Sequence, residues 1–317
     1  MFPDRLSGFF SDCQVPASYK KGKKMRDPKI AVIGNPGSWS TEKLADVLEK
    51  KTGFRCVVEM SKLTMDFSSR SLILGDIDLA LLDALVIKKI GPDYSPDMFN
   101  RLEMLRFFCK IGIPVFSRPE RIMAAINRLS CTVTLQKGDI AMPPTFITED
   151  VDQAVKVVRR FGKAVFKPLY SSKARGMILV EDDENCRSRI ENFQTMGNTT
   201  MYIQKLINIP GKDLGVAFLG GEYIGTYARR QGGGWSTSTS SGGRYETYQP
   251  EPEIISLAHK AQSLFGLDFT CVDVVETDEG PMIFEVSAFG GFRGLIKACD
   301  IDAAELYAEY VIRKLMA

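Results

Sequence analysis

The chain has 317 residues, of which 44% are hydrophobic and 25% charged, and its formal net charge is +2. These values are typical of a soluble globular protein of two or three domains, and they argue against nucleic acid or a membrane as the main partner. Seven scattered cysteines without a CxxC pair and a single histidine argue against a disulfide framework, a zinc site or a histidine-based triad, and favour the reducing cytoplasm.

The first 118 residues predict a tail and then an α/β domain. Residues 1–27 lack a signal-peptide pattern, carry a basic cluster at 20–26, and are expected to form a flexible basic tail. Residues 28–118 alternate short apolar strands with helices, which indicates a parallel sheet. Strands are expected at Lys29–Gly34, Cys56–Glu59, Asp78–Leu82 and Pro114–Phe116, and helices at Thr41–Lys51 and Asp97–Lys110. The turn at 34–38 lacks the full GxGxxG and the P-loop lysine, so a plain strand-to-helix turn is preferred to a phosphate site.

Residues 119–201 contain the strongest sign of an anionic ligand. The amphipathic helix Val151–Phe161 precedes a strand, Ala164–Pro168, in which Lys167 stands among apolar residues. A buried ammonium group is costly unless it meets an anion. The following loop, residues 170–176, offers hydroxyls, backbone N–H groups and cations that could fold over a triphosphate. A purely structural hairpin is the alternative.

Residues 202–317 begin with strands and a stretch rich in glycine and serine. The strand Tyr202–Ile207 is followed by a hairpin around Gly221 and Glu222, which ends at Arg229. The stretch after Arg229 is either a flexible linker or a loop that closes over a ligand. Helices are expected at Glu253–Phe265 and Asp302–Met316.

The last hairpin places two acids opposite each other. Its strands run from Phe269 to Thr277 and from Pro281 to Ser287, and centring the turn on Glu279 puts Asp273 across from Glu285. Facing carboxylates repel, so a cation is expected between them. Either Mg²⁺ fills this role, or Lys and Arg side chains balance two partly exposed acids. Alternation assigns residues 273, 285 and 287 to one face, and Val272, Val274, Phe284 and Val286 to the other.

Taken in order, these motifs resemble the ATP-grasp ligases, and in particular the RimK-type branch, which joins glutamate to a carboxylate. The resemblance covers about residues 119–317. It rests on Asn127-Arg128 before a Pro-x-Thr strand, on Lys167 and its loop, on the strand around Gln204, and on the last hairpin with its glycine loop and Arg293. It implies an α/β fold, α+β in the C-terminal half, in which a parallel α/β domain precedes two ATP-grasp subdomains at 119–201 and 202–317.

The resemblance also implies a set of site residues. Mg²⁺, or Mn²⁺ in its place, would be bound by Asp273, Glu285 and Ser287, and Arg229 and Arg293 would serve catalysis near the acylphosphate and the acid. The implied ATP-binding residues are Arg128, Lys167, Ser171, Ser172, Lys173, Gln204, Lys205, Leu206, Ile207, Asp213, Ser236, Thr237 and Ser238. Of these, Lys205 and Leu206 would contact adenine through their backbone, and Asp213 would contact the ribose.

The implied reaction is ATP-dependent formation of an amide from a carboxylate and an amine through an acylphosphate. The expected substrates are small molecules or peptides, without membrane or nucleic acid, and a homo-oligomer is compatible with the sequence. Four positions depart from the family pattern: Ser287 and Ser238 replace Asn, Gly215 replaces Arg, and Asn127-Arg128 replaces Asp-Lys. These departures motivate two alternatives, a nucleotide-binding regulatory protein without ligase turnover and a kinase that stops at a phosphorylated product.

Overall fold

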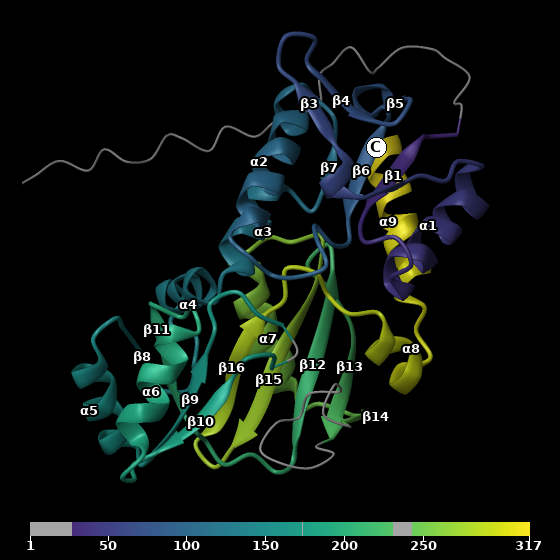
Figure 1. Cartoon of the computed structure of the whole chain (residues 1–317). Coiled ribbons are helices and arrows are strands. Elements are labelled where there is room, and N and C mark those ends of the chain that lie inside the picture. Colours follow the sequence, from purple (N-terminus) through teal and green to yellow (C-terminus); the bar gives the residue numbers. More distant parts are fainter. Residues whose placement is uncertain (1–26, 173, 231–242) are drawn as a thin grey trace, which may run out of the picture.

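The structure is a computed structural model that describes residues 27–172, 174–230 and 243–317 (Figure 1). The predicted basic tail, except for its last residue, lies outside the described residues, as do four predicted ATP-binding residues: Lys173, Ser236, Thr237 and Ser238. No helix in the described part of the chain is both long and apolar enough to cross a membrane.

The N-terminal domain is built on a four-stranded parallel sheet of order β2-β1-β6-β7, as the alternating pattern predicted. β1 and β6 are completely buried, as expected for central parallel strands. The elements of this sheet and its helices are β1 (Ile30–Ile33), α1 (Trp39–Thr52), β2 (Val57–Val58), η2 (Met60–Lys62), β6 (Ala84–Ile87), α2 (Asp97–Lys110) and β7 (Val115–Phe116).

The strand predicted at Asp78–Leu82 is wrong. Asp78 ends a short strand, and its carboxylate accepts the Ala80 N–H and so caps a turn of 3₁₀ helix. The parallel strand lies a few residues later, in the wholly apolar β6. The short strands form an additional antiparallel sheet that the sequence analysis missed, with β3 (Thr64–Asp66), β4 (Ser71–Leu74), β5 (Ile77–Asp78) and the 3₁₀ helix η3 (Leu79–Leu81).

The middle subdomain is an antiparallel sheet of order β10-β9-β11-β8, covered by two helices. Its core contains Val158 and Phe193 from these helices and Phe166 and Ile203 from the strands. The elements are α3 (Pro119–Ile126), α4 (Arg128–Lys137), β8 (Thr145–Thr148), α5 (Val151–Phe161), β9 (Lys163–Lys167), β10 (Ile178–Glu181), α6 (Cys186–Thr195) and β11 (Met201–Lys205).

The C-terminal subdomain is a five-stranded antiparallel sheet of order β14-β13-β12-β15-β16. The last helix, α9, returns to the N-terminal domain and packs beside α1, where Tyr307 and Val311 share a core with Leu44 and Leu48 (Figure 1). The predicted domain boundaries stay predictions. The elements are β12 (Lys212–Leu219), β13 (Glu222–Arg230), β14 (Arg244–Thr247), α7 (Pro252–Ser263), β15 (Phe269–Thr277), β16 (Gly280–Val286), α8 (Arg293–Cys299) and α9 (Ala303–Met316).

Candidate active site

Asp273 and Glu285 lie directly opposite each other on β15 and β16, which confirms the predicted register. The face assigned to Phe284 was wrong. The register shifts after Asp273, so that Val274 pairs with Ile283. Phe284 is therefore left without a partner on β15 and forms a β-bulge. As a result Phe284 lines the same cavity as Glu285 and does not point into the core.

Each of the two acids is paired with an arginine. Arg128 Nη1 lies 3.0 Å from Glu285 Oε2, and Arg229 Nη2 lies 3.0 Å from Asp273 Oδ1. The second interpretation of the facing acids, balance by basic side chains, therefore describes this structure.

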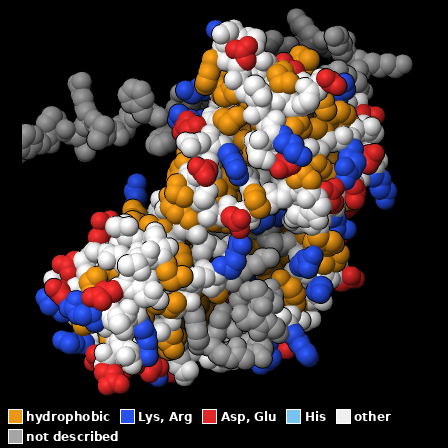
Figure 2. All heavy atoms as spheres, in the orientation of Figure 1, with side chains coloured by type: hydrophobic (Ala, Val, Ile, Leu, Met, Phe, Trp, Pro, Cys, Tyr) orange, Lys and Arg blue, Asp and Glu red, His pale blue; other side chains and the backbone are white. Residues whose placement is uncertain are grey.

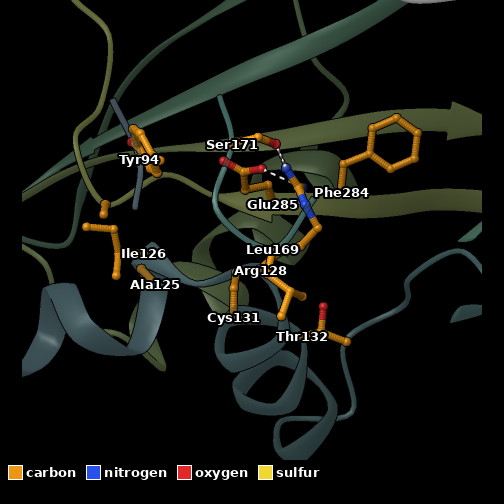
Figure 3. A pocket seen from close by; sticks show the side chains of 11 residues that line it. Tyr94, Ala125, Ile126, Arg128, Cys131, Thr132, Leu169, Ser171, Phe284 and Glu285 are labelled. Atoms are coloured by element: carbon orange, nitrogen blue, oxygen red, sulfur yellow. Dashed lines mark hydrogen bonds and ion pairs between the residues drawn. The ribbon is translucent and has the colours of Figure 1, made fainter. Parts of the chain in front are cut away.

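Arg128 is placed by the start of α4. The side-chain oxygen of Asn127 accepts a hydrogen bond from the Ser130 N–H and caps this helix. Arg128 is therefore the first residue of the helix. Figure 3 shows the guanidinium reaching both Glu285 and Ser171. A third bond, from Nε to the Pro168 carbonyl at 3.3 Å, fixes its plane. Arg128 thus ties the acid of β16 to the loop after β9.

Arg229 is shared between two acids. It forms a bidentate pair with Asp213, with Nε–Oδ1 and Nη2–Oδ2 distances of 3.0 and 2.6 Å, and it also reaches Asp273. The Asp213 side chain is only 6% exposed. The carboxylate that was predicted to contact the ribose is therefore bound to an arginine in this structure, because the two residues are direct neighbours across β12 and β13.

Gly215 leaves room for this arrangement. It lies opposite both Asp273 and Tyr227, in the strand between them. A Cβ on Gly215 would stand 2.3 Å from the Tyr227 ring, which is far too close. The arginine of the family pattern cannot fit here beside Tyr227, and the guanidinium of Arg229 supplies positive charge at Asp273 from the next strand.

The electrostatics of Asp273 indicate a shortage of positive charge. Burial, together with the Asp213 and Glu285 carboxylates, raises the pKa of Asp273 to about 7, although Arg229 acts in the opposite direction. Two carboxylates with a hydroxyl at Ser287 are hard oxygen donors that suit Mg²⁺. Among the described residues no group of three His, Cys, Asp or Glu side chains is arranged to hold a metal ion alone, so phosphate oxygens and water would complete the coordination. The donor set fits a Mg²⁺ ion that is bound together with a phosphate.

Lys167 is buried, as the sequence predicted, but its partner in this structure is neutral. Its Nζ donates to the Gln204 side-chain oxygen and lies 5.0 Å from the Phe284 ring centre. Burial and the nearby Arg128 lower the pKa of Lys167 to about 7. Such a group gains from an anionic ligand, which would favour its charged form.

The backbone N–H groups of the two residues predicted to contact adenine are paired within the fold, and the contact itself stays a prediction. The backbone N–H of Lys205 donates to the Pro144 carbonyl at 2.9 Å, and that of Leu206 donates to the Lys163 carbonyl at 3.1 Å, because strand pairing continues past the end of β11. These two N–H groups are therefore not free for a base. The Ile207 N–H has no backbone partner among the described residues.

A cavity of about 10 Å³ lies where Arg128, Glu285 and Ser171 meet. Its volume is that of one water, so any larger ligand would require β16 and the loop after β9 to separate. Ser172 does not line it; its hydroxyl accepts a bond from Arg175 Nη2 at 3.1 Å. Of the eleven lining residues only Arg128, Ser171 and Glu285 were predicted from the sequence; the eight others are Tyr94, Ala125, Ile126, Cys131, Thr132, Leu169, Phe284 and Ala288.

Arg293 is not brought to this cluster. It is exposed at the start of α8 and stacks on Trp39 at 5.1 Å. The next residue, Gly294, packs directly against the Tyr227 ring, which turns Arg293 outward. Ser287 follows β16, and its hydroxyl makes no hydrogen bond with another described residue, while its N–H donates to the Cys271 carbonyl.

This fold is the ATP-grasp fold. A model of the RimK-like ATP-grasp domain matches residues 125–311, and the chain belongs to this family. The tetrahydromethanopterin:alpha-L-glutamate ligase of Methanosarcina acetivorans is 26% identical over 89% of this chain and 98% of its own length. A probable alpha-L-glutamate ligase of Nitrosococcus oceani is also 26% identical, over 89% of this chain and 95% of its own.

Solved structures agree on the fold. The ATP-grasp ligase PsnB in complex with a minimal precursor has a TM-score of 0.70 at 16% identity, over 91% of this chain and 99% of PsnB. A RimK domain protein of Sphaerobacter thermophilus has a TM-score of 0.69 at 20% identity, over 90% of this chain and 99% of its own. The chain is an ATP-dependent ligase of the carboxylate–amine type, and a regulatory role without turnover is not favoured.

Proposed function

We propose that this ligase joins the amine of an amino acid, in the first instance L-glutamate, to a carboxylate of a small molecule or peptide. The glutamate ligases among its relatives support the choice of amine. The proposal rests mainly on the basic side chains around the two facing acids of β15 and β16. Arg128 of α4 pairs with Glu285, and Arg229 of β13 pairs with Asp273. Lys167 of β9 is close enough for both carboxylates to influence its pKa. Phosphoryl transfer needs such positioning and charge neutralisation and no protein nucleophile.

The reaction proceeds in two steps. A carboxylate oxygen of the acid attacks the γ-phosphorus of ATP, a new P–O bond forms, and ADP leaves. The amine then attacks the acyl carbon, phosphate leaves with the bonding electron pair, and the amine loses a proton to solvent. In the proposed arrangement Lys167 and Arg128 hold phosphate oxygens, and Arg229 stabilises charge on the acylphosphate. Asp273 and Glu285 would hold Mg²⁺, which would neutralise phosphate charge.

The remaining assignments are proposals as well. Ser171 and Ser172 would contact phosphate, and Gln204 would orient Lys167. The backbone of Lys205, Leu206 and Ile207 would contact adenine. Asp213 would orient Arg229, and Ser287 would be a weaker metal ligand. Lys173 and residues 236–238, which were predicted to bind ATP, lie outside the described residues. A cytoplasmic location is supported by the free cysteines among the described residues. Mg²⁺ and ADP are present together in one solved PsnB complex, which supports the choice of cofactors.

The proposal predicts ADP release that depends on an acid. The full chain is incubated with Mg-ATP and a panel of acids that includes L-glutamate and α-L-glutamyl-L-glutamate. Hydroxylamine replaces the amine, because it converts an acylphosphate to a stable hydroxamate. Hydroxamate in proportion to ADP supports the proposal. ATP binding without turnover for every acid would restore the regulatory alternative, and a phosphorylated product that resists the amine would identify a kinase.

Replacing Lys167 by Ala is expected to weaken ATP binding by ~1.5–3 kcal/mol, the range of a charged hydrogen bond, or roughly 10- to 150-fold. Isothermal titration with ATP measures this. Lys163→Ala is the matched control, since Lys163 lies on the same strand but is exposed and paired with Glu181. Parent-like affinity of Lys167→Ala would show that this lysine is structural.

A further inference from the structure

The N-terminal domain sends one segment, residues 88–94, to the site. It begins at the carboxyl end of β6, where the N–H groups of Lys88 and Lys89 donate to the Ile33 carbonyl at the end of β1. In the sheet, β2 lies on one side of β1 and β6 on the other. The connection from β1 to β2 and the connection from β6 to β7 therefore leave this point in opposite directions. In open α/β sheets the crevice at such a switch point is where ligands bind.

This segment is fixed against the catalytic part of the chain. Lys88 is 2% exposed, donates to the Gly290 carbonyl and lies 3.9 Å from the Phe292 ring centre. Asp93 pairs with Arg175 of the loop after β9, at 2.9 Å. The segment therefore touches both loops that flank the two facing acids, and Figure 2 shows basic side chains along this junction.

Tyr94 ends the segment and reaches the cavity. Its ring packs edge-on against Phe289, with centroids 6.4 Å apart, and Lys89 Nζ lies 5.9 Å from its centre. Tyr94 lines the cavity together with Arg128, Ser171 and Glu285, and Figure 3 shows Glu285 between Tyr94 and Arg128 in this view. It is the one N-terminal-domain residue among those that line the cavity.

The Tyr94 hydroxyl is not used within the described part of the chain. The ring is held by its faces and edge, while the hydroxyl makes no hydrogen bond with another described residue. A half-buried tyrosine normally finds a partner for this group. At neutral pH a phenol is an uncharged O–H donor, which suits a ligand oxygen.

We propose that the Tyr94 hydroxyl donates a hydrogen bond to the carboxylate of the acid substrate at this cavity. The inference rests on the proposed function and extends it, because it assigns acid binding to the N-terminal domain. The acid, and not the nucleotide, is the partner because Tyr94 enters from outside the two antiparallel sheets whose residues are proposed to bind ATP and Mg²⁺. Arg128, which lines the same cavity, holds phosphate oxygens in the proposed function, so the acid held by Tyr94 would lie next to the phosphoryl group that it attacks.

The test is Tyr94→Phe, which keeps the ring contacts and removes only the hydroxyl. With the acid of the panel that has the highest kcat/KM, the KM for the acid is expected to rise by about 10-fold or more, as for a hydrogen bond to a charged group. The Kd of ATP and the Tm are expected to stay those of the parent. Tyr223→Phe is the control, since Tyr223 is a half-exposed tyrosine whose hydroxyl bonds Thr226 instead.

Three results would overturn the inference. A parent-like KM in Tyr94→Phe, with a lowered Tm only in Tyr94→Ala, would show that the ring is purely structural. An equal loss of ATP affinity would place the hydroxyl on the nucleotide. Absence of acid-dependent turnover in the parent would overturn the proposed function and this inference with it. Turnover in the parent, with an unchanged KM for the acid in Tyr94→Phe, would overturn this inference alone.

Discussion

Replacing Glu285 by Gln is expected to abolish Mg²⁺-dependent ATP turnover while the protein remains folded. The amide keeps the size of the side chain but removes one of the two hard anionic donors that face each other on β15 and β16. Mg²⁺ bound through one carboxylate and Ser287 would hold phosphate poorly. ADP release across a Mg²⁺ series measures the effect, and electron paramagnetic resonance of added Mn²⁺ with nucleotide measures metal binding separately.

The fold should tolerate this change. The Glu285 side chain is 36% exposed, and the amide oxygen of Gln can still accept the hydrogen bond that Arg128 Nη1 donates to Glu285. Arg128 also keeps its bonds to Pro168 and Ser171. Glu276→Gln is the control, since Glu276 lies on the same hairpin but pairs with Lys212 at 3.1 Å. Parent-like ATP consumption in Glu285→Gln would remove this residue from the metal site.

Local sequence pattern was enough to predict the hairpin that carries the facing acids. Turn residues and alternation fix the pairing of Asp273 with Glu285, since a slip by one residue would reverse every side chain. Lys167 was found in the same way, because a charge inside an apolar strand needs a reason. The parallel sheet of the N-terminal domain followed from alternating helices and strands, apart from the strand placed at Asp78–Leu82.

The errors arise where the decisive contact is tertiary. A bulge that no turn residue announces moves Phe284 to the side of Glu285. The N–H groups of Lys205 and Leu206 are paired with residues that are distant in sequence, which the sequence pattern did not reveal, while the adenine contact of these two residues stays a prediction. Tyr94 reaches the cavity from another domain, and only the switch-point position of its segment could have pointed to it.

Arg229 shows why the departures from the family pattern could not be interpreted one at a time. Gly215 looked like a lost charge in the sequence. In the structure the missing side chain leaves space for Tyr227, and Arg229 meets both Asp213 and Asp273 from the neighbouring strand. The positive charge has moved to another strand, which a pattern of single positions does not reveal.

Replacing Arg229 by Ala is therefore expected to destabilise the protein in a pH-dependent way. Burial already raises the pKa of Asp273 to about 7, so the folded state binds this proton more tightly than the unfolded state. Asp273 thus favours folding below its unfolded pKa of about 4, and this contribution is lost as pH rises through 7. Without Arg229, which lowers the pKa of Asp273, ionisation of the buried acid costs more.

Denaturant unfolding from pH 5 to pH 8 measures this difference. Loss of one partner of a buried pair is expected to cost about 3–5 kcal/mol at pH 8 and clearly less at pH 5. Arg230→Ala, on the same strand but exposed and paired with Glu246, should have a small effect at either pH. Arg229→Lys retains the charge without the bidentate fork, so kcat should fall far more than ATP affinity. A destabilisation of Arg229→Ala that is equal at both pH values would show that Asp273 does not depend on this arginine for its counter-charge.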